Sequence, residues 1–195
     1  MNTTSFFVEL IVIGVGAAIW ITLGVLSVFG IAWLTSGSFS QNLGLPLLVP
    51  SLSVVYVLGI ITDRAADWLF GPWSRALQQR AFGNAEEYYR ARTTLYARFA
   101  ALTDLYEYGR TRLRICRGWA LNAALILIAF DVFAARQTSA YPRGPLWVAG
   151  TVGFGLLAVS ALMAWRGLTV QEVARLHHQS RLLASDKEQE PITRD

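Results

Sequence analysis

Four long apolar stretches limit this chain to a fold that spans a membrane. They cover residues 6–34, 43–61, 118–135 and 145–165, and each is almost free of charged side chains. A helix of about 20 residues crosses the roughly 30 Å of hydrocarbon in a bilayer. The sequence therefore predicts an all-α integral membrane protein with four transmembrane helices.

The positions of the basic residues predict how these spans are oriented. Fifteen of the 17 Lys and Arg residues lie in residues 63–117 or from Arg166 onward, whereas Arg136 and Arg143 fall on the opposite side. Basic residues are retained on the cytoplasmic side of a membrane, so both termini are expected in the cytosol. Because nearly all the basic residues are arginine, we expect a bacterial source and the inner membrane as the location.

This topology divides the chain into four segments. Residues 1–62 form a transmembrane hairpin with an uncharged outer connection, and residues 118–165 form a second hairpin. Residues 63–117 form a cytosolic Arg/Tyr-rich helical segment, and residues 166–195 a cytosolic tail helix with a disordered end after Ser185. Spans 2, 3 and 4 thus continue as cytosolic helices. Their total of about 85 cytosolic residues is small for a catalytic domain, so we do not expect an enzyme.

Two breaks are predicted in the helices that follow the second span. Gly71 and Pro72 are expected to end its helix, because proline lacks the backbone donor that a helix interior requires. Gly83 and Asn84 predict a second break before a new helix that starts at Ala85.

The helix that starts at Ala85 is expected to run without interruption into the third span, since no proline follows before Pro142. A stripe of apolar and aromatic residues recurs on one face at spacings of three and four. Its members are Tyr88, Leu95, Phe99, Leu102, Tyr106 and Leu113. The stripe needs a partner, which is either the tail helix or the same helix of a neighbouring subunit.

Small residues mark places where spans can approach closely. Gly14 and Ala18 are four residues apart in the first span, and Gly150 and Gly153 lie in the fourth. Such spacings serve either packing within the chain or association between subunits.

Three polar side chains fall inside or at the edge of the hydrocarbon, where they are candidates for function. Glu9 can pair with an arginine, Asn122 can bond across helices, and Asp131 can pair with Arg136 or Arg143. Alternatively, Glu9 or Asn122 lines a polar path through an oligomer, since rings of such side chains set ion selectivity.

Arginine and tyrosine are concentrated on the helical segment that precedes the third span. Juxtamembrane arginines bind anionic lipid headgroups and fix topology. Guanidinium groups also grip phosphates, and aromatic rings stack on bases, so a nucleotide or short oligonucleotide is the other candidate ligand. The sequence contains no metal-ligand or nucleotide-loop motif, and no cofactor or metal is predicted. The candidate ligand-binding residues are Arg90, Arg92, Arg98, Tyr106, Tyr108, Arg110, Arg112, Arg114 and Arg117.

Four spans, little cytosolic mass and an Arg/Tyr-rich helix at residues 86–117 resemble the small membrane effectors of bacterial anti-phage defence systems. In those systems a cytosolic nucleotide messenger opens an oligomeric channel. The resemblance implies a homo-oligomeric pore, with a tetramer as the working hypothesis, whose opening depolarises the membrane. The alternative is a non-conducting scaffold or assembly factor whose Arg/Tyr helix docks an acidic protein partner.

Overall fold

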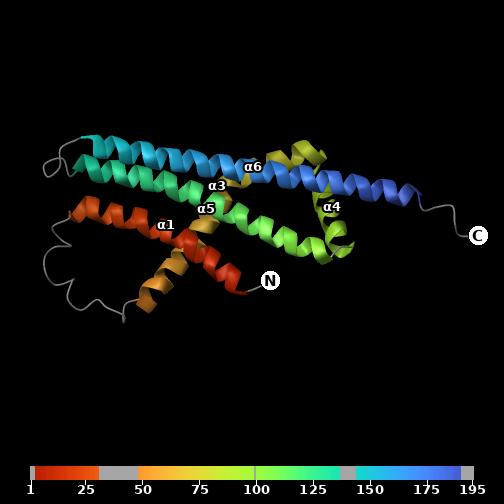
Figure 1. Cartoon of the computed structure of the whole chain (residues 1–195), viewed down its shortest axis with the longest axis horizontal. Helices are drawn as coiled ribbons and strands as arrows, with labels where there is room; N and C mark the ends of the chain where they lie inside the picture. The colour runs from red at the N-terminus through yellow and green to blue at the C-terminus, as the bar shows by residue number, and fades with distance from the viewer. Residues whose placement is uncertain (1–2, 31–47, 99, 137–143, 190–195) are drawn as a thin grey trace, which may run out of the picture.

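The computed structural model describes residues 3–30, 48–98, 100–136 and 144–189, and describes side chains at 6–30, 49–95, 108–136 and 144–182 (Figure 1). These ranges hold helices and no strand, which confirms the all-α prediction. In chain order the helices are α1 (Thr3–Phe29), α3 (Leu48–Phe82), α4 (Ala85–Arg98), α5 (Ala100–Arg136) and α6 (Pro145–Gln189).

Four of these helices, α1, α3, α5 and α6, are long and apolar enough to cross a membrane. Most of their large apolar side chains are exposed in the single chain, as expected for surfaces that face lipid. The prediction of four helices that are long and apolar enough to span a membrane is confirmed. Helix α6 has 45 residues and is about 68 Å long, more than twice the roughly 30 Å thickness of the hydrocarbon in a bilayer.

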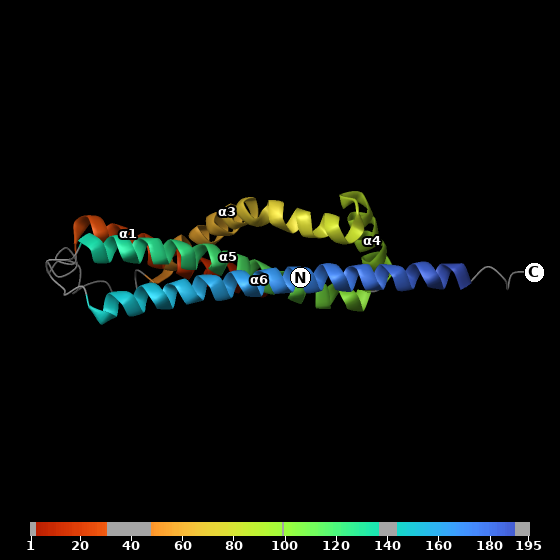
Figure 2. The same ribbon diagram turned by 90° about the horizontal axis from the view of Figure 1, so that it is seen from above.

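Helices α1, α5 and α6 form a bundle in which α5 packs against both of the others. Figures 1 and 2 show α5 and α6 running side by side, with α1 beginning near the middle of α5. We call one region of the molecule the polar extension. It consists of α4, the end of α3, and the parts of α5 and α6 that extend past the start of α1.

Helix α3 crosses α1 at a point where the two backbones touch. A Cβ atom added at Gly14 would overlap the carbonyl oxygen of Val55, and one added at Gly59 would overlap that of Leu10. Glycine is therefore required on both helices for this approach. The packing of Gly14 is within the chain, whereas nothing lies within 4 Å of a Cβ added at Gly153.

The predicted helix end at Gly71 and Pro72 is wrong, because α3 continues through Pro72 to Phe82. A proline inside a helix removes one hydrogen bond and bends the helix without having to end it, and α3 is bent along its length (Figure 2). Aromatic packing holds both sides of the proline: the ring of Trp165 on α6 lies 4.9 Å from that of Phe70 and 6.3 Å from that of Trp73.

The predicted break at Gly83 and Asn84 is confirmed. Gly83 has φ +73°, a conformation that favours glycine, and its N–H donates to the Gln79 carbonyl over 2.8 Å. The side chain of Asn84 accepts a hydrogen bond from the N–H of Glu86 over 3.3 Å, so it caps the helix that begins at Ala85.

The expectation of one continuous rod from Ala85 into the third span is wrong. Helix α4 runs across the ends of its neighbours, and α5 takes a different direction from Ala100 onward (Figures 1 and 2). Packing explains the change of course, because α4 must cross toward α6 to bury Tyr88 and Leu95 against it.

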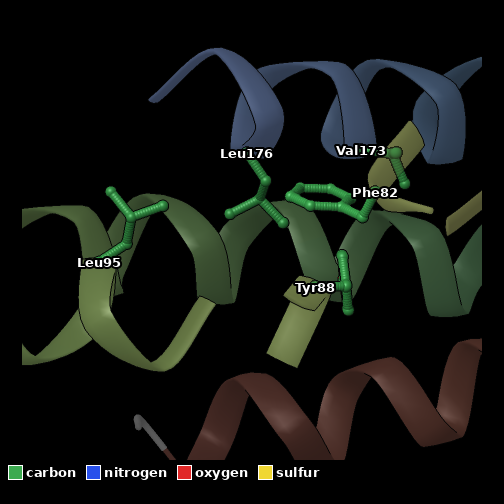
Figure 3. Close-up of a cluster of buried hydrophobic side chains, with 5 residues drawn as sticks. All are labelled: Phe82, Tyr88, Leu95, Val173 and Leu176. Carbon is green, nitrogen blue, oxygen red and sulfur yellow. The ribbon is translucent and has the colours of Figure 1, made fainter. Parts of the chain in front are cut away.

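An apolar cluster at the far end of the polar extension joins α3, α4 and α6 (Figure 3). Its members are Phe82, Tyr88, Leu95, Val173 and Leu176. The rings of Phe82 and Tyr88 meet edge to face with centroids 5.3 Å apart. The tail helix of the same chain is therefore the partner of Tyr88 and Leu95.

Several other predictions fall wholly or partly on residues outside the described part of the chain. Phe99 and the side chains of Leu102 and Tyr106 from the predicted stripe lie outside them. Helix α6 continues to Gln189, so the disordered end predicted after Ser185 is wrong for residues 186–189, and residues 190–195 are outside the described part.

Candidate functional site

Five charged side chains from three helices meet where the apolar spans pass into the polar extension. Arg114 and Arg117 lie one turn apart on α5. Arg114 contacts Asp63 of α3 over 2.7 Å and Glu9 of α1 over 3.2 Å. Arg117 contacts Asp63 over 3.0 Å and is also paired with Asp67. We call this group the charge cluster.

Most of the charge cluster is shielded from solvent. The side chains of Glu9 and Asp63 are 3% exposed, those of Arg114 and Arg117 are 13% and 15% exposed, and only Asp67, at 55%, is open. Charges removed from water are tolerated only when they are paired with good geometry. The cluster therefore holds α1, α3 and α5 together at one position along the bundle.

A cavity of about 310 Å³ lies beside the charge cluster, between α3, α4, α5 and α6. Three carboxylates line it, those of Asp63, Asp67 and Glu172. The five arginines that line it are Arg64, Arg92, Arg110, Arg114 and Arg117. Five guanidinium groups against three carboxylates leave the lining with a formal charge of +2, so this cavity, which we call the arginine cavity, attracts anions.

The candidate ligand-binding arginines fall into distinct environments. Arg92 and Arg110 line the arginine cavity, as do Arg114 and Arg117, whose charges are also paired within the chain. Arg112 is exposed elsewhere on α5. These placements bring Arg92, Arg110, Arg114 and Arg117 together around one cavity.

The remaining candidates lie away from the arginine cavity or outside the described side chains. The guanidinium carbon of Arg112 sits 5.6 Å from the ring centroid of Tyr108, and both residues are exposed. Arg90 pairs with Glu86 over 2.8 Å on the surface of α4. The side chains of Arg98 and Tyr106 are outside the described part of the chain.

The three polar residues predicted inside the membrane all bind other helices of the same chain. Glu9 pairs with Arg114, and the fully buried Asn122 side chain donates to the Ile13 carbonyl over 2.8 Å. Asp131 accepts a hydrogen bond of 2.7 Å from Thr151 of α6. The expected arginine pair of Glu9 and cross-helix bond of Asn122 are present, whereas Asp131 pairs with a threonine, and Arg143 lies outside the described residues.

Four residues of the site were missed by the sequence analysis: Arg64, Asp63, Asp67 and Glu172. A signal for two of them exists, because Asp63 and Asp67 are four residues apart on one helical face directly after the second span. Within the described ranges, no group of three His, Cys, Asp or Glu side chains is placed to hold a metal ion.

Comparison with known proteins gives no match: no family model, no curated protein and no solved structure is similar to this chain.

Proposed function

We propose that the chain is a subunit of a homo-oligomeric channel in the bacterial inner membrane, with a tetramer as the working hypothesis. An anionic cytosolic ligand, a nucleotide messenger, binds in the arginine cavity and opens the channel, which depolarises the membrane. One observation carries the proposal: Arg114 lines the cavity and is also paired with Glu9 of α1 and Asp63 of α3. The ligand site and the contacts between three spans thus share a side chain.

The orientation in this proposal follows the distribution of basic residues. The arginines of the cavity all lie on the side of the membrane where α3, α5 and α6 continue past their apolar stretches. Retention of basic residues on the cytoplasmic side places this end, and both termini, in the cytosol. A soluble messenger made in the cytosol would then reach the cavity directly.

Competition for the arginines can transmit the binding of a ligand to the transmembrane helices. A phosphate group bound in the cavity lies near Arg114 and Arg117 and competes electrostatically with their carboxylate partners. Weaker contacts between these arginines and Asp63 loosen α3 from α5. A ligand shifts such an equilibrium only by its difference in affinity for the two packings, and each tenfold difference supplies about 1.4 kcal/mol.

Ion flux from proteoliposomes tests the proposal. Purified protein is reconstituted in liposomes that contain a fluorescent ion indicator, and linear and cyclic nucleotides are added on the side of the polar extension. We expect one class of nucleotide to raise the flux, and Arg110→Ala to raise the ligand concentration needed by about tenfold or more. Arg112→Ala is the matched control, because it removes an arginine from the same helix outside the cavity.

The absence of flux with every nucleotide, or an equal loss of response in Arg110→Ala and Arg112→Ala, would count against the channel or against the cavity respectively. The two failures are distinct, because the first concerns conduction and the second concerns where the ligand binds.

A second candidate function is a non-conducting scaffold that docks an acidic protein. The exposed aromatic rings on the polar extension favour it: Tyr89 and Tyr108 are 58% and 62% exposed and lie beside Arg90 and Arg112. Co-purification of a stoichiometric acidic partner, lost in Tyr108→Ala with Arg112→Ala, together with no conductance, would favour this function over the channel.

A further inference from the structure

The arginine cavity contains a carboxylate that the charge cluster does not use. Glu172 projects from α6 into the lining, is half-buried, and lies within electrostatic range of Arg92 and Arg110. Asp63 and Asp67 are held by the arginines of α5, whereas among the described side chains Glu172 forms no ion pair. The cavity therefore offers an acceptor on α6 opposite donors on α4 and α5.

This combination of charges selects against simple ions. A ligand that carries only negative charge is attracted by Arg92 and Arg110 but repelled by Glu172. A simple cation is attracted by Glu172 but repelled by the two arginines. A ligand that has a phosphate group and, a few ångströms away, an amino or hydroxyl donor satisfies both sides with charge-assisted hydrogen bonds. Specificity then arises from the donor as well as from the phosphate.

The size of the cavity limits the ligand further. Its volume of about 310 Å³ is at the lower end of the range for small-molecule sites, roughly 300 to 1,000 Å³. A mononucleotide or a lipid headgroup matches this volume, so of the nucleotide and the oligonucleotide expected from the sequence we test the nucleotide.

We infer that the arginine cavity binds a single phosphate group that bears an amino or hydroxyl donor, with the phosphate on Arg92 and Arg110 and the donor on Glu172. The inference rests on the ligand site of the proposed function and names the chemistry of its ligand. Two sources share this chemistry: a soluble mononucleotide, with its ribose hydroxyls and base amino group, and the phosphoethanolamine headgroup of a membrane lipid.

Binding measured without any conductance assay tests the inference. The protein is placed in nanodiscs of phosphatidylcholine, whose headgroup has no N–H donor, and calorimetry is run with phosphoethanolamine, phosphocholine, adenosine 5′-monophosphate and inorganic phosphate. Phosphoethanolamine and phosphocholine form a matched pair, because both carry a phosphate and a cationic nitrogen but only the first has N–H donors. We expect a donor-bearing probe to bind at least about tenfold more tightly than its donor-free counterpart, a difference of about 1.4 kcal/mol.

Two substitutions separate the roles of the two sides. Glu172→Gln should reduce the advantage of the donor-bearing probe to less than about threefold, since the charge that assists the hydrogen bond is lost. Arg110→Ala should weaken every probe alike. Preference for adenosine 5′-monophosphate supports the soluble source, and preference for phosphoethanolamine supports the lipid source.

Three results overturn the inference: no binding of any probe at 10 mM, equal affinity for phosphoethanolamine and phosphocholine, or a donor advantage unchanged in Glu172→Gln. Failure of the channel alone looks different, because the probes then bind with the expected preferences while proteoliposomes show no flux. Conversely, flux opened by a donor-free polyphosphate would keep the channel and remove this ligand chemistry.

Discussion

Neutralising Asp63 is expected to destabilise the bundle more than neutralising the other aspartate of the charge cluster. Three contacts from two arginines converge on the Asp63 carboxylate: two from Arg114, at 2.7 and 3.5 Å, and one from Arg117, at 3.0 Å. Removing one partner of a buried ion pair costs about 3–5 kcal/mol. Here Arg114 keeps Glu9 and Arg117 keeps Asp67, and an asparagine oxygen still accepts one hydrogen bond. We therefore expect Asp63→Asn to lower the free energy of unfolding by about 2–3 kcal/mol, less than the full loss of a partner.

Asp67 provides the matched control one turn further along α3. Its side chain is 55% exposed and, among the described side chains, forms an ion pair with Arg117 only. Pairs that reach solvent contribute about 0–1 kcal/mol, so Asp67→Asn should cost about 1 kcal/mol or less. The same chemical change at two neighbouring positions of one helix should thus differ by about 2 kcal/mol, which the difference in burial explains.

Equilibrium unfolding in mixed micelles measures this difference. The protein in mild detergent is titrated with sodium dodecyl sulfate, and the loss of helix and the change in tryptophan fluorescence are followed for wild type, Asp63→Asn and Asp67→Asn. Free energies for the two variants that agree within about 0.5 kcal/mol would refute the reasoning. The cluster would then contribute no more than ion pairs on a surface.

Three further predictions concern packing, and the same unfolding titration checks each. Gly14→Ala should cost about 1–3 kcal/mol because its Cβ would overlap α3, while Gly24→Ala, with open space around it, should change stability by less than about 0.5 kcal/mol; equal effects would contradict the close crossing. Asn122→Ala should cost about 0.6–1.7 kcal/mol, the range for a hydrogen bond between membrane helices, and a stabilised variant would show that the bond to Ile13 contributes nothing. Leu95→Ala should cost about 2–5 kcal/mol as a buried core truncation, and a loss below 1 kcal/mol would mean that α4 is not docked on α6.

The spans and the start of α4 could be predicted because their causes are local. Hydrocarbon thickness and the run of apolar residues determine a span without reference to the rest of the chain. The start at Ala85 follows from Gly83 and Asn84, whose backbone conformation and side-chain acceptor end one helix and cap the next.

The bends depend on packing between distant residues and could not be predicted in this way. Pro72 stays inside α3 because Phe70 and Trp73 on either side of it pack on Trp165, more than 90 residues later in the chain. The turn of α4 away from α5 has no glycine or proline as a cause, since it follows from the burial of Leu95 against α6.

The candidate site was predicted in composition but not in arrangement. Spacings of three and four residues put Arg110, Arg114 and Arg117 on one face of α5, and all three line the arginine cavity. These spacings gave no means to see that Asp63, 51 residues earlier, holds Arg114, or that Glu172 joins the cavity from α6. Pairing between helices depends on their depth and rotation in the bundle, which spacing within one helix does not contain.

If α3 tilts, its crossing with α1 at the two glycines is the point about which it turns. No side chain separates the backbones at Gly14 and Gly59, so a tilt of α3 about this point would meet side-chain packing only further along the helices, as between Phe7 and Tyr56, whose rings lie 4.9 Å apart. The arm from Gly59 to Asp63 is about 6 Å long, and the arm from Gly59 back to Leu48 about 16 Å. A displacement of 1 Å at the charged end therefore swings the opposite end by nearly three times as much, in the reverse direction.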